Sequence, residues 1–129
     1  MQAYTEMLTV SDTDLDELRH VNNVIYIQWV NTIAKAHWIK VASQNLLDNY
    51  FWVLANHQIK YKYPAFVNDN ILLNTFVESS NGITSTRIVE IFNNDTQKLL
   101  AISETTWCFM SFATRKPTRI TAEIKSLFC

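Results

Sequence analysis

One long apolar segment, residues 24–42, restricts the folds that this chain can adopt. At 3.6 residues per turn, apolar side chains cover most of its surface, and one narrow polar stripe remains, made of Gln28, Asn31, Thr32 and Lys35. Other parts of the chain must therefore cover this helix on several sides. Because polar and charged residues interrupt the segment, it is predicted to be a buried helix beginning at Asn22 or Asn23, with no membrane span.

A run of strands is predicted after Asn49. In residues 58–63, Ile59, Tyr61 and Tyr63 alternate with polar side chains, which is the period-two pattern of a half-buried strand. Pro64 ends this strand because proline has no N–H to donate to a sheet.

The remaining elements follow from similar patterns. Residues 7–10 end a short strand before the helix, and further strands are predicted over 71–78, 84–92 and 99–110. The sequence Ser80-Asn81-Gly82 predicts a hairpin, because Asn-Gly suits the type I′ turn, and residues 93–95 predict a second turn. Residues 121–128 form a short amphipathic end.

This order of elements indicates an α+β fold. The apolar surface of one dominant helix that precedes a meander of strands is best buried when the strands form one curved antiparallel sheet wrapped around a long central helix. The chain has 129 residues, of which 48% are hydrophobic and 18% charged, so residues 1–129 are expected to form a single globular domain.

Charge and cysteine content exclude several other classes of protein. A net charge of −1 gives no general attraction to nucleic acid. Cys108 and Cys129 do not have metal-site spacing, and two scattered cysteines fit a reducing compartment. The N-terminus has no signal-peptide pattern, so the cytoplasm is the expected location. Gly82 is the only glycine, so there is no glycine-rich phosphate loop, and we expect no metal or cofactor.

The segment from Asp14 to Tyr26 contains the main candidates for catalytic residues. It places two carboxylates, an imidazole and two amides directly before the long helix. Backbone N–H groups are free at a helix N-terminus, and acid/base groups beside them can attack the carbon of a carbonyl whose oxygen those N–H groups hold.

This segment resembles the signature of the hotdog-fold acyl thioesterases, in which Asp-x-Asp precedes His-Val-Asn-Asn-x-x-Tyr. That group includes the 4-hydroxybenzoyl-CoA thioesterase type and the plant acyl-carrier-protein thioesterases. Residues 61–65, 81–85 and 115–117 resemble further family segments. The resemblance implies a hotdog fold and hydrolysis of acyl thioesters. It also implies homo-oligomers, either dimers or dimers of dimers, with sheets joined edge to edge and sites shared across the interface.

The resemblance also assigns roles to residues. Asp16, four positions before His20, falls on the family's catalytic aspartate, as general base or nucleophile, and Asp14 is its partner. His20 orients the loop, binds the carbonyl or stabilises Asp16. Asn22 and Asn23 complete the catalytic set, and backbone N–H groups from Asn22 to Val24 are the expected oxyanion donors.

The chain departs from the family pattern at several positions. Plant relatives have asparagine and glutamate where this chain has Leu18 and Pro64, and bacterial relatives often have glycine at Arg19. Many relatives carry a glutamate early on the helix, where this chain has Asn31 or Thr32. These departures leave Asp16 as the main acid/base candidate.

The substrate-binding candidates surround this centre and extend to two basic groups. They are Asp14, Val24, Tyr26, Lys60, Lys62, Arg115 and Lys116. The lysines and Arg115 would bind the phosphates of coenzyme A. Trp29, Trp38, Trp52 and Trp107 line an acyl tunnel or belong to the core or dimer interface. We expect His37 and His57 to be structural.

Alternative readings exist for both the site and the function. Asp12, Asp14 and Asp16 could be a solvated acidic loop, with Asn22 or Asn23 as an ordinary helix cap. An acyl-CoA thioesterase is the leading function. A carrier-protein thioesterase, a non-catalytic acyl-binding or dimerisation module, and a hotdog dehydratase or hydratase are the alternatives.

Overall fold

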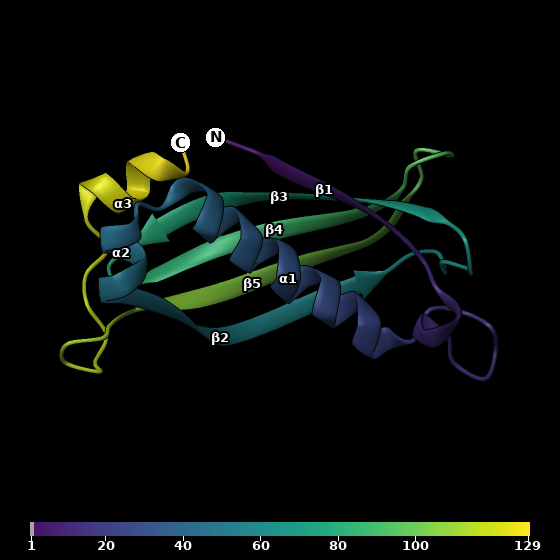
Figure 1. The fold of residues 1–129 in the computed structure, drawn as a ribbon, viewed down its shortest axis with the longest axis horizontal. Coiled ribbons are helices and arrows are strands. Elements are labelled where there is room, and N and C mark those ends of the chain that lie inside the picture. Colours follow the sequence, from purple (N-terminus) through teal and green to yellow (C-terminus); the bar gives the residue numbers. More distant parts are fainter. Residues whose placement is uncertain (1) are drawn as a thin grey trace.

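The computed structural model describes residues 2–129, in which a long helix lies across one face of a five-stranded antiparallel sheet (Figure 1). Along the chain the elements are β1 (Tyr4–Thr9), the 3₁₀ turn η1 (Asp12–Asp14), α1 (Asn23–Val41), α2 (Gln44–Asn49), β2 (Tyr50–Tyr61), β3 (Asn70–Asn81), β4 (Thr84–Asn93), β5 (Leu99–Ser111) and α3 (Ala122–Leu127). The strand order is β1-β3-β4-β5-β2, so β1 and β2 form the two edges. The predicted α+β architecture, one antiparallel sheet packed on one long helix, is confirmed.

The long helix begins where the sequence predicts. Asn22 is its N-cap, and its Oδ1 accepts a 3.0 Å hydrogen bond from the Val24 N–H, which satisfies one of the free donors of the first turn. The helix ends at Val41, and Ser43 caps the short α2 that follows. Within residues 2–129, no helix combines the length and apolar character that crossing a membrane requires.

The strand predicted over 58–63 is longer and starts earlier. β2 begins at Tyr50 and ends at Tyr61, with a bulge between Leu54 and Asn56. Its first half contains a run of consecutive apolar residues, which hides the alternation that marks a strand in the sequence. Lys62 lies just beyond the strand, where its N–H donates to the carbonyl of Leu100 at 2.7 Å.

The hairpin between β3 and β4 occurs where predicted, but its turn type was predicted wrongly. Asn81 pairs with Thr84, so the two loop residues are Gly82 and Ile83. Only Gly82 has a positive φ, of 65°. A positive φ at the first loop residue alone is the pattern of a type II′ turn, whereas type I′ needs it at both. The strand pairing extends one residue further than the Asn-Gly signal suggests.

Two hydrophobic clusters fill the space between α1 and the sheet. One surrounds the N-terminal half of the helix and includes Trp29, Ile33 and Ile91. The other surrounds its C-terminal end and includes Trp38 and Phe109. Six polar or charged side chains are also buried, and we call this group the polar belt: His37, Thr75, Ser85, Arg87, Ser103 and Thr105.

The centre of this polar belt is the contact between His37 of α1 and Arg87 of β4. Nη1 of Arg87 lies 2.9 Å from Nδ1 of His37 and also donates to Thr75 Oγ1 at 3.0 Å. The His37 ring stacks on Tyr4 and meets Phe128 edge-on. Burial, with a further contribution from the charge of Arg87, lowers the pKa of His37 to about 4. At neutral pH the ring is therefore neutral and accepts at Nδ1, because a guanidinium only donates.

A buried hydrogen bond fixes the other end of the helix. The hydroxyl of Tyr26, a side chain with 3% exposure, accepts a 3.1 Å hydrogen bond from the N–H of the fully buried Ala65. The carbonyl of Ala65 in turn accepts from the Val21 N–H at 3.0 Å. These two hydrogen bonds thus join the start of helix α1 to the segment after β2.

Replacing Tyr26 with phenylalanine is expected to destabilise the protein by about 1–3 kcal/mol, because the buried Ala65 N–H loses its only side-chain partner. Urea unfolding measures this change. Tyr63→Phe is the matched control, since that ring is 50% exposed; its free energy of unfolding should change by no more than about 0.5 kcal/mol. Equal effects of the two substitutions would contradict the assignment.

The ordinary pKa of His37 is 6.5, and its pKa in the folded protein is about 4. The free energy of unfolding is therefore expected to fall as the pH drops from 6.5 to about 4. In this window the unfolded chain binds a proton at His37 and the folded protein does not, so His37 alone lowers the free energy of unfolding by up to about 3 kcal/mol. His37→Gln keeps an acceptor for Arg87 and removes the titration. Urea unfolding at several pH values should give the variant a shallower slope than the wild type; identical slopes would refute this origin.

Candidate active site

A cavity of about 300 Å³ opens at the N-terminal end of α1. Residues from the loop before α1, from the helix itself and from the end of β2 line it: Asp16, His20, Val21, Asn23, Tyr26, Tyr61, Lys62, Tyr63 and Pro64. The cavity thus unites five residues that the sequence singles out, namely Asp16, His20, Asn23, Tyr26 and Lys62. Sequence positions 16 and 62 meet because β2 runs back along the helix (Figure 1).

The Asp16 side chain closes the loop that carries it. Its Oδ1 accepts hydrogen bonds from the N–H groups of Leu18, at 2.9 Å, and His20, at 3.2 Å. The Asp16 N–H donates to the carbonyl of His20 at 2.8 Å. The other carboxylate oxygen, Oδ2, has no hydrogen-bond partner within residues 2–129. The loop therefore holds the carboxylate by one oxygen and leaves the other one available.

Arg19 has a φ of 65°, a left-handed conformation that few residues other than glycine adopt readily. This is the position at which bacterial relatives often carry glycine. The tight return of the chain from Asp16 to His20 requires that backbone shape. The His20 ring, which follows directly, packs edge-on against Phe66 at a centroid distance of 5.2 Å.

Only one of the three predicted oxyanion donors is unoccupied. The Asn22 N–H donates to the carbonyl of Asp14 at 2.8 Å, and the Val24 N–H donates to the Asn22 side chain. The Asn23 N–H, in contrast, has no acceptor within residues 2–129, and Asn23 lines the cavity. Of the donors predicted between Asn22 and Val24, the Asn23 N–H is therefore the one without an acceptor among residues 2–129.

Three further candidates lie outside this cavity. Asp14 is part of η1, and its Oδ2 accepts from the Ser11 N–H at 2.9 Å, so it shapes the turn. Val24 is 58% exposed on the first turn of the helix. Lys60 is exposed on β2, and neither it nor Val24 lines the cavity.

In the folded molecule, Arg115 and Lys116 lie at the end opposite to Asp16 (Figure 1). They follow β5, whose last residue, Ser111, pairs with Tyr50 at the start of β2, whereas Asp16 is near Tyr61 at its other end. Figure 1 shows the loop between β5 and α3 at the end of the molecule away from η1. The Arg115 guanidinium lies 5.8 Å from the centre of the Phe51 ring.

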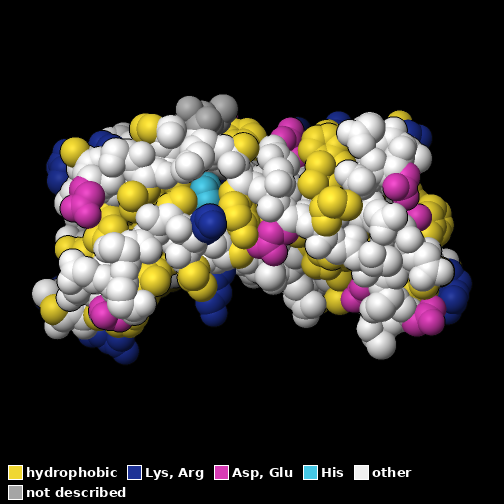
Figure 2. All heavy atoms as spheres, turned by 45° about the horizontal axis from the view of Figure 1, so that its top comes forward, with side chains coloured by type: hydrophobic (Ala, Val, Ile, Leu, Met, Phe, Trp, Pro, Cys, Tyr) yellow, Lys and Arg dark blue, Asp and Glu magenta, His cyan; other side chains and the backbone are white. Residues whose placement is uncertain are grey.

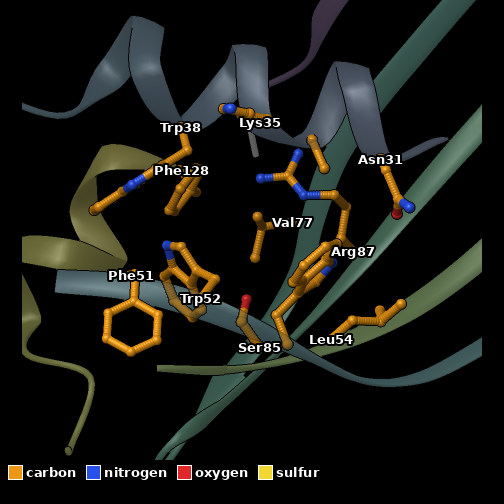
Figure 3. A pocket seen from close by; sticks show the side chains of 12 residues that line it. Asn31, Lys35, Trp38, Phe51, Trp52, Leu54, Val77, Ser85, Arg87 and Phe128 are labelled. Carbon is orange, nitrogen blue, oxygen red and sulfur yellow. The ribbon is translucent and has the colours of Figure 1, made fainter. Parts of the chain in front are cut away.

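A second and larger cavity, of about 490 Å³, lies beside the C-terminal half of α1 (Figure 3). Helix, sheet and C-terminal residues line it: Asn31, Ala34, Lys35, Trp38, Phe51, Trp52, Leu54, Val77, Ser85, Arg87, Trp107 and Phe128. Three of the four tryptophans suggested for an acyl tunnel are among them. Trp29 belongs to the first hydrophobic cluster instead.

Sequence analysis missed the polar part of this cavity. Sequence analysis assigned no buried role to Arg87, yet its side chain is only 5% exposed. A signal was present, because Ser85, Arg87, Val89 and Ile91 occupy alternate positions of one strand and therefore share one face. On the face drawn in Figure 2, Lys and Arg side chains are interspersed with Asp and Glu.

Solved structures with the same fold are numerous. The chain resembles a 1,4-dihydroxy-2-naphthoyl-CoA thioesterase from Synechocystis at 18% identity, with a TM-score of 0.84, over 99% of this chain and 96% of that one. It resembles the probable thioesterase YbaW from Escherichia coli at 21% identity and a TM-score of 0.83, over 95% and 94% of the two chains. A 4-hydroxybenzoyl-CoA thioesterase variant bound to 4-hydroxybenzoyl-CoA has a TM-score of 0.87 at 10% identity, over 100% of both chains.

These likenesses establish the hotdog fold. No curated protein matches the chain in sequence. Residues 2–128, in contrast, match the family described as the acyl-ACP thioesterase N-terminal domain. The Asp16 loop, the capped helix start and the sheet around α1 are all within the matched region, and the chain therefore belongs to the acyl-ACP thioesterase N-terminal domain family.

Proposed function

We propose that the protein hydrolyses an acyl thioester to a free acid and a thiol. The observation that carries the proposal is that Asp16, His20 and the unoccupied Asn23 N–H line one cavity at the N-terminus of α1. Membership of the acyl-ACP thioesterase N-terminal domain family supports the same reaction class.

The thioester carbonyl oxygen accepts a hydrogen bond from the Asn23 N–H, with the helix dipole favouring negative charge there. Asp16 Oδ2 then acts by one of two routes. As general base it takes a proton from water, whose oxygen attacks the carbonyl carbon. As nucleophile it attacks that carbon directly, and water cleaves the resulting anhydride. In both routes the C–S bond breaks, a C–O bond forms, and the thiolate leaves and is protonated.

The neighbouring side chains hold this arrangement in position. His20 keeps Asp16 oriented through its backbone, and its ring borders the same cavity. Tyr26 fixes the first turns of the helix through Ala65, and therefore the direction of the Asn23 N–H. Asn22 acts as the cap, and Asp14 acts on the loop rather than on the substrate.

A dimer joined through β2 would complete the site. β2 is an edge strand, so one side of its backbone is unpaired, and Val53 and Leu54 expose apolar surface beside that edge. Its twelve residues extend over about 36 Å. If two copies pair antiparallel along β2, the Tyr61 end of one chain lies beside the Tyr50 end of the other.

That arrangement would bring together residues that one chain keeps apart. The Asp16 cavity of one chain would adjoin Phe51 and Trp52, which line the 490 Å³ cavity of the second chain. We assign the acyl chain to this larger cavity. Arg115 and Lys116 of the second chain, with Lys62 of the first, would then bind the phosphates of coenzyme A. An acidic acyl carrier protein is the alternative carrier for the same basic groups.

Asp16→Asn is expected to lower kcat/KM for acyl-CoA substrates by roughly 10²- to 10⁴-fold, because the amide is neither a base nor a nucleophile. Its oxygen can still accept from the N–H groups of Leu18 and His20, so the loop should remain folded. A thiol-release assay over short to long acyl-CoA thioesters measures the change, together with binding of the same ligands, which should be largely retained.

Glu17→Gln is the matched control, since it removes the same charge from an exposed neighbour in the same loop. Its activity should stay within about twofold of the wild type. Equal losses in both variants would mean that loop charge, and not Asp16 chemistry, controls the rate. A folded wild-type protein that binds acyl-CoA and acyl carrier protein thioesters without turning over either would identify a binding module.

A further inference from the structure

The larger cavity contains a buried positive charge without a carboxylate partner. Arg87 projects from β4 into the space under α1, and Figure 3 shows its guanidinium directed toward the side where Trp38 and Phe128 lie. Its side chain is 5% exposed. Within residues 2–129 the single ion pair joins Arg19 to Asp12 on the surface, so no acidic group neutralises Arg87.

Arg87 has donors left for a ligand. Both of its protein hydrogen bonds, to His37 and to Thr75, start from Nη1. Nη2 and Nε have no partner within residues 2–129, and they are not sealed from solvent as the unpartnered Nε2 of His37 is. Burial lowers the pKa of Arg87 to about 10, which leaves the group charged at neutral pH.

The rest of the lining fits the hydrocarbon part of an amphiphile. Aromatic and aliphatic side chains form most of the wall, and its two charged residues, Lys35 and Arg87, are both cationic. The volume of about 490 Å³ is within the range of roughly 300–1,000 Å³ that small-molecule sites occupy. A buried charge without a counterion is unfavourable, so a ligand carboxylate that reaches it would bind far better than a bare chain.

We propose that this cavity selects acyl groups that carry a second, anionic group at the end remote from the thioester, and that Arg87 binds that group through Nη2 and Nε. The inference rests on the proposed thioester hydrolysis and names its substrate class. A carboxylate suits the planar fork of a guanidinium, which binds two oxygens at once. His37 is a positioning residue here, because its Nδ1 holds Nη1 and so orients the remaining donors.

A matched pair of thioesters tests the proposal on the wild-type protein. Octanoyl-CoA and the mono-CoA thioester of suberic acid have the same chain length and differ only in the terminal carboxylate. We expect kcat/KM to be about 10- to 100-fold higher for the suberyl thioester, as a charge-assisted pair implies. Equal values, or a preference for octanoyl-CoA, would overturn the proposal.

Arg87→Met tests the residue itself. Methionine is similar in length and removes the charge, and urea unfolding checks that the variant is folded, because His37 and Thr75 lose their hydrogen-bond partner. The suberyl preference should disappear in this variant and persist in Arg119→Met, which removes an exposed arginine. A preference that survives in a folded Arg87→Met variant would assign selectivity elsewhere and overturn the proposal.

Calorimetric binding of unreactive amide analogues separates this inference from the proposed reaction. For this purpose the thioester end is replaced by a neutral amide: suberic acid monoamide should bind the wild type about 10- to 100-fold more tightly than octanamide, and only the monoamide should weaken in Arg87→Met. That result without any thioester turnover would refute hydrolysis and keep the site. Turnover of octanoyl-CoA that depends on Asp16, with no preference for the ligand with a remote carboxylate, would keep hydrolysis and refute the site. Equal weakening of both amides would mean that Arg87 does not recognise the remote carboxylate, which also overturns the proposal.

Discussion

Burial of α1 against the sheet is the constraint on which the rest of the structure depends. The helix buries seven side chains from Tyr26 to Trp38. No flat layer can cover so broad an apolar surface, so the strands curve around the helix and close two hydrophobic clusters along its length. The polar belt around His37 and Arg87 accompanies these clusters, and the two cavities lie toward the two ends of the helix.

The same packing gives the helix N-terminus its chemical properties. Tyr26 is held by Ala65, and Asn22 caps the first turn, so the Asn23 N–H is fixed in position and has no acceptor within residues 2–129. The loop before it uses one oxygen of Asp16 as an internal hydrogen-bond acceptor, which orients the other oxygen without consuming it. A donor and a carboxylate that are positioned in advance need no reorganisation when charge develops on a substrate.

Most of the fold, and the residues that meet at the centre of the candidate site, could be predicted from the sequence, because both depend on local patterns. The start of α1, the β3–β4 hairpin and the residues from Asp16 to Tyr26 belong to this class. Features that depend on tertiary pairing could not be predicted. The turn at Gly82 shifted by one residue with the strand register, and β2 began eight residues early because its first half lacks alternation. Arg87 is buried because its face of β4 meets the helix, which the sequence does not specify. Arg115 and Asp16 are far apart because β2 carries the chain from one end of the molecule to the other.

The central claim is that Asp16 of one chain acts with the larger cavity of a second chain, and a mixed dimer tests it most directly. One chain carries Asp16→Asn, and the other carries Ala34→Phe, which fills the cavity beside α1. Each homodimer should be inactive. If the sites are shared, the purified mixed dimer has one site with both parts intact and should recover about half of the wild-type kcat per dimer. A mixed dimer as inactive as the two homodimers would contradict the account, because both lesions would then affect sites built within single chains.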